Sequence, residues 1–117
     1  MKNILIVDDQ PNLQKLFSEE LQDEGYEVVS VSDVASVLEY LEKTKPDLVL
    51  LDLYIRGFEG WDVLHDLKSR YPYLPVLIVT AYDSFMDDPR ASQADGYMVK
   101  NFNELGKLKQ KIAQILH

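Results

Sequence analysis

Five polar side chains in this sequence have the types and positions needed to bind a metal ion and a phosphoryl group. They are Asp8, Asp9, Asp52, Thr80 and Lys100, and each stands at or just past the end of a short apolar run. Carboxylates are ligands for hard divalent cations, while a hydroxyl and an ammonium can donate hydrogen bonds to phosphoryl oxygens. If the apolar runs are parallel strands, their ends meet at one edge of a sheet and the five groups converge there.

Three carboxylates that converge in one place need a positive counter-charge. Two like charges about 4 Å apart repel each other by roughly 4 kcal/mol at an effective dielectric constant near 20. Mg²⁺ suits a site of few carboxylates that also binds water and a substrate phosphate. Lys100 supplies a second positive charge. The residues therefore predict a magnesium ion and phosphoryl chemistry at this place.

The apolar runs before these residues are continuous, which is typical of strands buried on both faces of a parallel sheet. Strands are expected at residues 4–7, 27–31, 48–51, 75–79 and 97–99. The segments between them carry apolar residues at helical spacing, most clearly at Val34, Val37, Leu38 and Leu41. Alternation of strand and helix predicts one α/β domain, residues 1–117, with helices on both faces of the sheet.

The ends of the expected helices carry recognisable signals. Pro11 stands at the start of the first helix and Gly25 at its end. Apolar stripes over residues 61–71 and 105–116 predict two further helices. The segment between Thr80 and the last strand has no such stripe.

The fourth helix is therefore expected to be short. Asp88 and Pro89 are typical of an N-cap and a first helical residue, which leaves room for only a turn or two before Gly96. We expect residues 83–90 to be mobile, because few apolar side chains anchor them.

Five strand–helix units most often wind in the order 2-1-3-4-5, the flavodoxin-like topology, in which ligands bind between strands 1 and 3. Asp8 and Asp9 end the first expected strand and Asp52 ends the third. The apolar pattern thus predicts the same location as the carboxylates do.

Composition bounds the function. The chain has 117 residues, a net charge of −8 and no cysteine. The charge opposes direct binding to nucleic acid or to an anionic membrane, and the missing cysteines exclude disulfides and thiolate catalysis. The four apolar residues before Asp8 are too few for a signal peptide, and no segment is long enough to span a bilayer. A cytoplasmic protein is expected.

Four sequence features together resemble the receiver domain of two-component response regulators. They are Asp8-Asp9, Asp52, Thr80-Ala81 and Tyr97-x-x-Lys100, and the resemblance covers the whole chain. It implies that Asp52 is the phosphoacceptor.

The resemblance also implies roles for the remaining residues. Asp9, Asp52 and the Tyr54 backbone carbonyl would bind Mg²⁺, and Asp8 would hold it through water. Thr80 and Lys100 would each bind a phosphoryl oxygen, and Tyr97 would be an aromatic switch that follows Thr80. These assignments are expectations from the family pattern.

The implied function is a signalling switch and not the turnover of a separate substrate. The phosphoryl donor would be a phosphohistidine of a sensor histidine kinase or of a phosphotransfer protein. Phosphorylation would change the face of the fourth helix, fifth strand and last helix, which would bind a downstream protein. The chain would be a monomer or a weak, phosphorylation-dependent dimer, either stand-alone or excised from a longer regulator.

Two departures from the family pattern bear on this face. Asn101 follows Lys100 where receivers usually have proline, so we expect a trans bond or a strained cis bond, since cis costs about 2.5–4 kcal/mol without proline. The spacing from Thr80 to Lys100 is also about two residues shorter than usual, and we expect the usual dimerisation face to be altered.

Other interpretations remain open. Asp8 or Asp9 could cap the first helix, and Lys100 taken alone could be a solvated lysine. At the level of the whole chain, the alternatives are a pseudo-receiver that binds proteins without phosphorylation and a phosphohydrolase of the haloacid dehalogenase type. Phosphohydrolases of that type place their nucleophile in Asp-x-Asp after the first strand, whereas the first expected strand of this chain is followed by Asp8-Asp9-Gln10.

Overall fold

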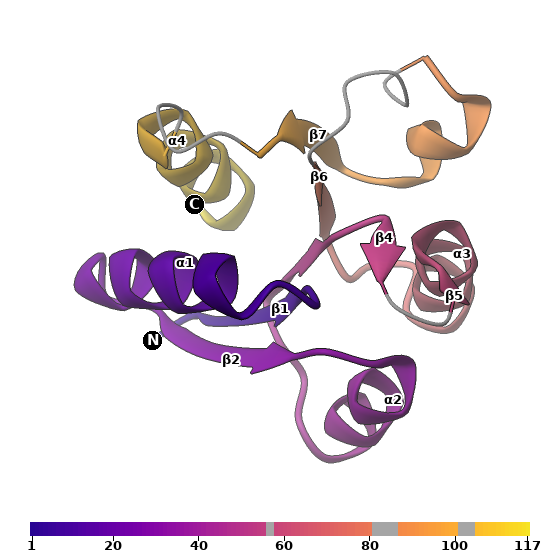
Figure 1. The fold of residues 1–117 in the computed structure, drawn as a ribbon, viewed down its shortest axis with the longest axis horizontal. Coiled ribbons are helices and arrows are strands. Elements are labelled where there is room, and N and C mark those ends of the chain that lie inside the picture. The colour runs from indigo at the N-terminus through magenta and orange to yellow at the C-terminus, as the bar shows by residue number, and fades with distance from the viewer. Residues whose placement is uncertain (56–57, 81–86, 101–104) are drawn as a thin grey trace.

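The computed structural model of the chain describes residues 1–55, 58–80, 87–100 and 105–117. A five-stranded parallel sheet forms its centre, in the order β2-β1-β3-β6-β7 (Figure 1). The strands are β1 (Asn3–Val7), β2 (Glu27–Val31), β3 (Leu48–Leu51), β6 (Val76–Thr80) and β7 (Gly96–Val99). The order confirms the predicted flavodoxin-like topology, with the winding reversed between β1 and β3.

Helices cover both faces of the sheet. Helices α1 (Pro11–Asp23) and α4 (Leu105–Leu116) lie on one face, and α2 (Val34–Lys43) and α3 (Gly60–Arg70) lie on the other (Figure 1). The sheet has an apolar core on each face. Alternate residues of a strand pack into one core or the other, because successive side chains of a strand point to opposite faces. In β1, Ile4 and Ile6 pack with Phe17 of α1, whereas Leu5 packs with Val37 of α2.

Both predicted end signals of α1, Pro11 and Gly25, lie at the ends of the helix in the structure. Pro11 is the first helical residue, where a missing N–H costs no hydrogen bond. Gly25 has a φ of 95°, a left-handed conformation that favours glycine. The Gly25 N–H donates to the Gln22 carbonyl at 2.9 Å and the Tyr26 N–H to the Leu21 carbonyl at 3.2 Å. These bonds turn the chain directly into β2.

An unpredicted antiparallel pair follows β3. Strands β4 (Tyr54–Ile55) and β5 (Phe58–Glu59) pair with each other and lead into α3. Gly60 begins α3 so close to the preceding segment that an added Cβ would lie 2.4 Å from the Leu53 Cα. Its N–H donates to the Leu53 carbonyl at 2.8 Å. The segment after β3 is therefore held against the start of α3.

The fourth helical element is short, as expected. It is a 3₁₀-helix, η2 (Pro89–Gln93), and the Asp88 side chain caps it by accepting the Arg90 N–H at 2.9 Å. The Arg90 side chain, bonded to the Asp88 carboxylate, holds the pKa of that carboxyl below its ordinary value. The Arg90 guanidinium also lies 4.4 Å from the centre of the Trp61 ring. Residues 83–86 lie outside the described residues, and mobility of residues 83–90 stays a prediction.

Candidate functional site

The five polar residues lie together at the carboxyl ends of the strands. Asp8 and Asp9 follow β1, Asp52 follows β3, Thr80 is the last residue of β6, and Lys100 follows β7. The ends of β6 and β7 are joined by a hydrogen bond from the Lys100 N–H to the Thr80 carbonyl at 2.5 Å. The Asp52 N–H donates to the Val7 carbonyl at 2.9 Å, which fixes the end of β3 beside that of β1.

Asp8, Asp9 and Asp52 form a compact carboxylate cluster. One oxygen from each lies within 4.8 Å of the others. Asp8 is 2% exposed and Asp52 is 5% exposed, so both carboxylates are largely removed from water. Carboxylates this close and this buried are stable together only with cations beside them. The cluster therefore fits the predicted hard-cation site.

Asp8 is not the N-cap of α1. That position belongs to Gln10, whose side chain makes no capping bond. The Asp8 Oδ1 atom instead accepts the Gln10 N–H at 2.8 Å, and its Oδ2 atom faces Lys100. Helix capping thus does not account for Asp8.

Lys100 is the positive centre of the site and not a solvated lysine. Its Nζ lies 2.5 Å from the Asp8 Oδ2 and 2.9 Å from the Asp52 Oδ2, and its side chain is 5% exposed. It also donates to the Gln10 Oε1 at 3.0 Å. Hydrogen-bonded pairs of opposite charge are short and strong when buried. Lys100 thereby connects β7 to both β1 and β3.

The Thr80 hydroxyl is unsatisfied among the described residues. Thr80 is fully buried, and its Oγ1 has no hydrogen-bond partner among the described residues. Leaving a buried hydroxyl unpaired costs about 1–3 kcal/mol, so such a group indicates a site for a ligand or for a conformational change. A phosphoryl oxygen could accept the hydrogen bond that the Thr80 hydroxyl can donate.

Two glutamines support the site and were not predicted. The Gln14 side-chain amide donates to the Asp8 carbonyl and, at 3.0 Å, to the Val31 carbonyl, so it joins the ends of β1 and β2. Gln10 binds Lys100 as described above. Gln10 directly follows the acidic pair, and Gln14 lies one helical turn later, a spacing that places both on one side of α1.

The remaining predicted residues are only partly described. Tyr97 lies in β7, is half-buried and packs against the core cluster that contains Leu53 and Trp61. Tyr54 lies in β4, and the role expected for its carbonyl stays a prediction. The bond from Lys100 to Asn101 lies outside the described residues, and so does its expected geometry.

The fold and the site define a class: a doubly wound α/β domain with an acidic cluster, a buried lysine and a buried hydroxyl, unpaired among the described residues, at the carboxyl ends of its strands. The family description "Response regulator receiver domain" matches residues 4–113. The chain belongs to this family, as the sequence resemblance indicated.

Individual relatives agree with the family. The chain is 37% identical over 102 residues to the probable transcriptional regulatory protein TcrX of Mycobacterium tuberculosis, covering 86% of this chain and 44% of that protein. It is 35% identical over 104 residues to the alkaline phosphatase synthesis transcriptional regulatory protein PhoP of Bacillus subtilis, covering 87% and 43%. The chain thus spans less than half the length of these two curated relatives.

A solved structure matches over its full length. The response regulator protein TrrA of Thermotoga maritima, crystallised in complex with Mg²⁺-BeF, has a TM-score of 0.93 and 36% identity, with 99% of this chain and 100% of that chain covered. TrrA in complex with the histidine kinase ThkA has a TM-score of 0.89 and 36% identity, with full coverage of both chains.

No helix within the described ranges combines the length and the apolar character that crossing a bilayer requires.

Proposed function

We propose that this chain is a phosphorylation-controlled switch in which Asp52 accepts a phosphoryl group from a phosphohistidine. The donor would be a sensor histidine kinase or a histidine phosphotransfer protein. The observation that carries the proposal is the arrangement around Asp52: two further carboxylates within 4.8 Å, the Lys100 ammonium at 2.9 Å, and a buried Thr80 hydroxyl that has no hydrogen-bond partner among the described residues. TrrA, which is similar over its full length, was crystallised with a histidine kinase.

Each residue has a separate role in the transfer. A carboxylate oxygen of Asp52 forms a new P–O bond while the P–N bond to the donor imidazole breaks, and the electron pair of that bond returns to the ring nitrogen. Lys100 stabilises the ionised form of Asp52 and then donates to a phosphoryl oxygen. The Thr80 hydroxyl donates to another. Such transfer depends mainly on positioning and charge stabilisation.

The residues present fit a magnesium ion. Three carboxylates against one ammonium leave the site with a formal charge of −2 (−3 + 1), and oxygen ligands are those that Mg²⁺ prefers. Asp9, Asp52 and the Tyr54 carbonyl would bind the ion directly and Asp8 through water. When bound, Mg²⁺ would neutralise charge on the transferred phosphoryl group. The Mg²⁺-BeF complex of TrrA supports this assignment.

We propose that the switch proceeds through Thr80 and Tyr97. When Thr80 moves to bond the phosphoryl group, it vacates space beside β7, and the half-buried Tyr97 turns inward. Tyr97 therefore carries the local charge change to the face of η2, β7 and α4. A downstream protein, or a second copy in a weak dimer, would bind this face. The protein would not turn over a separate substrate.

The test is phosphate incorporation from acetyl phosphate. With Mg²⁺, intact-mass spectrometry should show one acid-labile phosphoryl adduct on the wild type and none on Asp52→Asn. An exposed aspartate on α3, Asp66, gives the matched control, and Asp66→Asn should label like the wild type. EDTA should abolish labelling.

Two outcomes would contradict the proposal. Equal labelling of Asp52→Asn would exclude Asp52 as the acceptor. If the wild type is not labelled but still binds a histidine kinase, the pseudo-receiver alternative is favoured. A cytoplasmic location and the absence of direct nucleic-acid binding stay predictions.

A further inference from the structure

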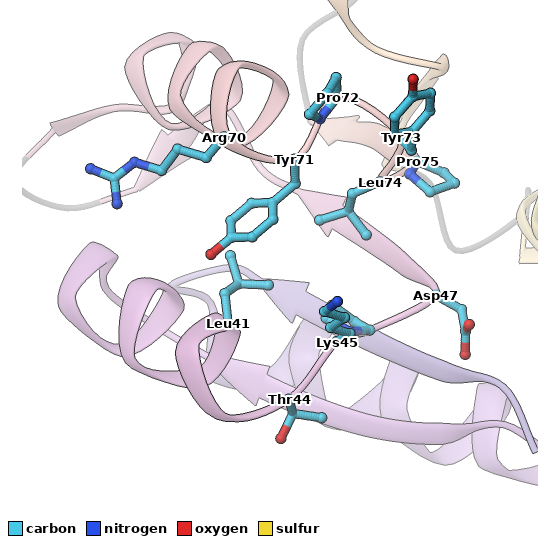
Figure 2. Close-up of a pocket in the computed structure, with 11 residues that line it drawn as sticks. Leu41, Thr44, Lys45, Asp47, Arg70, Tyr71, Pro72, Tyr73, Leu74 and Pro75 are labelled. Carbon is cyan, nitrogen blue, oxygen red and sulfur yellow. The ribbon is translucent and has the colours of Figure 1, made fainter.

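A cavity lies at the end of the sheet opposite to Asp52. It has a volume of about 420 Å³, within the range of roughly 300–1,000 Å³ typical of small-molecule sites. It opens between the segment from the end of α2 to β3 and the segment from α3 to β6 (Figure 2). Strand β3 separates it from the carboxylate cluster, and its 4 residues span about 13 Å. The cavity is therefore distinct from the phosphoryl site.

Apolar and aromatic side chains make up much of the lining of this cavity. Tyr71 and Leu74, which follow α3, point toward Leu41 of α2 (Figure 2). Prolines at positions 46, 72 and 75 form further surface of the lining. Tyrosine rings and proline rings offer planar faces, which suit a planar aromatic ligand.

The cavity is held open by fixed backbone. The Leu74 N–H donates to the Tyr71 carbonyl at 2.9 Å, and the Lys68 ammonium donates to the Leu74 carbonyl at 3.0 Å. On the opposite side, the Thr44 N–H donates to the Tyr40 carbonyl at 2.8 Å. A site formed before the ligand arrives avoids the entropic cost of ordering its loops.

Two cations on the lining indicate the charge of the ligand. Lys45 and Arg70 are exposed, and neither has an ion-pair partner among the described residues. The nearby Lys43 and Lys68, by contrast, pair with Glu39 and Asp95. The one carboxylate of the lining, Asp47, already accepts the Asn3 N–H at 2.7 Å. In a chain of net charge −8, this cavity therefore presents unpaired positive charge.

We propose that this cavity binds a small aromatic carboxylate. The planar ring would lie against Tyr71 and Leu74, and the carboxylate would pair with Lys45. The Arg70 guanidinium points away from these side chains (Figure 2) and would add longer-range positive charge. Tyr73 stands at the rim, is 97% exposed and points away from Leu41 (Figure 2); it would turn to cover the outer edge of the bound ring. This role is independent of phosphorylation at Asp52.

Naphthoate is the probe for the test. A titration followed by ¹⁵N–¹H NMR should show saturable shifts at the amides of residues 44–47 and 71–74, with a dissociation constant on the order of 1 mM for a ligand of this size. The neutral naphthylmethanol should bind at least ~10-fold more weakly, because it cannot form the ion pairs.

Variants separate binding from folding. Tyr73→Ala removes a side chain that has almost no contact with the fold, so it should leave the unfolding midpoint unchanged and weaken naphthoate binding several-fold. Lys45→Gln should also leave the unfolding midpoint unchanged and weaken naphthoate binding several-fold, and Arg70→Gln should weaken it less. Lys15→Gln, which removes an exposed lysine from α1, is the matched control and should bind like the wild type.

Three results would overturn the proposal. They are shifts that never saturate, equal binding of naphthylmethanol, and full affinity in a Lys45→Gln/Arg70→Gln double variant. Asp52→Asn should bind naphthoate normally, so a failure here is distinguishable from a failure of the phosphorylation proposal.

Discussion

At the scale of single residues, Lys100 is shared between two carboxylates before any phosphoryl group arrives. Its ammonium contacts Asp8 at 2.5 Å and Asp52 at 2.9 Å. A phosphoryl group on Asp52 would bring new acceptor oxygens, and Lys100 would then exchange its bond to Asp8 for one to phosphate. Loss of that bond would leave Asp8 available to the proposed Mg²⁺ site. The same ammonium would therefore offset negative charge both in the resting state and in the phosphorylated state.

The Thr80 hydroxyl leads to a prediction with opposite effects on stability and function. Valine has nearly the same shape without the hydroxyl, and Thr80→Val removes a fully buried polar atom that has no partner in the part of the chain that the structure describes. The free energy of unfolding of the unphosphorylated protein should rise by about 1 kcal/mol. Urea unfolding followed by the fluorescence of the single tryptophan measures this change.

The variant should also lose the structural response to phosphorylation, since it cannot donate to a phosphoryl oxygen. Phosphorylated Thr80→Val should show unperturbed β7 amides by NMR, whereas the wild type should show shifts there. A destabilised Thr80→Val would mean that the hydroxyl has an unseen partner in the resting state.

The sequence could predict the chemistry of individual residues where a strand ends, but not the contacts among side chains. Asp8, Asp52 and Lys100 were predicted because apolar runs locate strand ends. Gln10 and Gln14 were not, because an amide side chain carries no charge and no periodic signal. Their role depends on the direction in which α1 leaves β1.

At the scale of elements, the start of α3 is constrained by Gly60. A Cβ there would lie 2.4 Å from the Leu53 Cα and 2.8 Å from the Asp52 carbonyl oxygen. Gly60→Ala should therefore lower the free energy of unfolding by about 2 kcal/mol or more and displace the segment that follows Asp52. Urea unfolding and the rate of labelling by acetyl phosphate measure the two effects.

Gly106 offers the matched control for that substitution. It lies in α4, and an added Cβ meets no atom within 4 Å. Gly106→Ala should raise the free energy of unfolding by about 0.5 kcal/mol, because alanine is the better helix former. Similar effects of the two substitutions would contradict the steric argument.

The cap of α2 gives a prediction about pH. The Asp33 Oδ1 accepts the Ser36 N–H at 2.8 Å, and this bond holds the pKa of Asp33 below its ordinary value of 3.8. A carboxyl whose pKa is lower in the folded state contributes stability above the unfolded pKa and loses it as pH falls through the folded pKa. Asp33→Ala should therefore have a lower urea midpoint than the wild type near neutral pH.

The difference between the two midpoints should shrink below pH 3.8, where the wild-type carboxyl begins to gain a proton. Urea unfolding at a series of pH values, at constant ionic strength, measures it. A difference that stays constant through this range would show that the bond does not depend on the charge of Asp33.

Element prediction succeeded where a segment is long enough to show a pattern. Four of the main strands follow from continuous or nearly continuous apolar runs, and α1–α4 follow from helical stripes. Strand β2, which contains Glu27 and Ser30, was predicted as the remaining strand of the alternation. The β4–β5 pair was missed because two-residue strands have no detectable period. The fourth helical element, η2, was predicted to be short because its segment has no apolar stripe and only a few residues separate Asp88-Pro89 from Gly96.

At the scale of the whole molecule, the two ends of the sheet are separate working surfaces. Carboxyl ends of the strands carry Asp52 and its neighbours, and amino ends carry the cavity beside Tyr71. Both adjoin β3, which pairs with β1 on one side and with β6 on the other. A single domain of this size generally unfolds in one cooperative step. Ligand binding at either end should therefore stabilise the entire domain.

This linkage gives the last prediction. Beryllofluoride with Mg²⁺, the combination present in the TrrA crystal, should bind at Asp52 as a phosphoryl mimic. A ligand at about 100 times its dissociation constant stabilises the native state by about 2.7 kcal/mol, which corresponds to an increase in melting temperature of about 10 °C for a domain near this size. Thermal unfolding followed by Trp61 fluorescence measures the increase. Asp52→Asn should show the small effect of Mg²⁺ alone, and fluoride without beryllium should show none. An equal increase in Asp52→Asn would mean that beryllofluoride binds somewhere other than the acidic cluster.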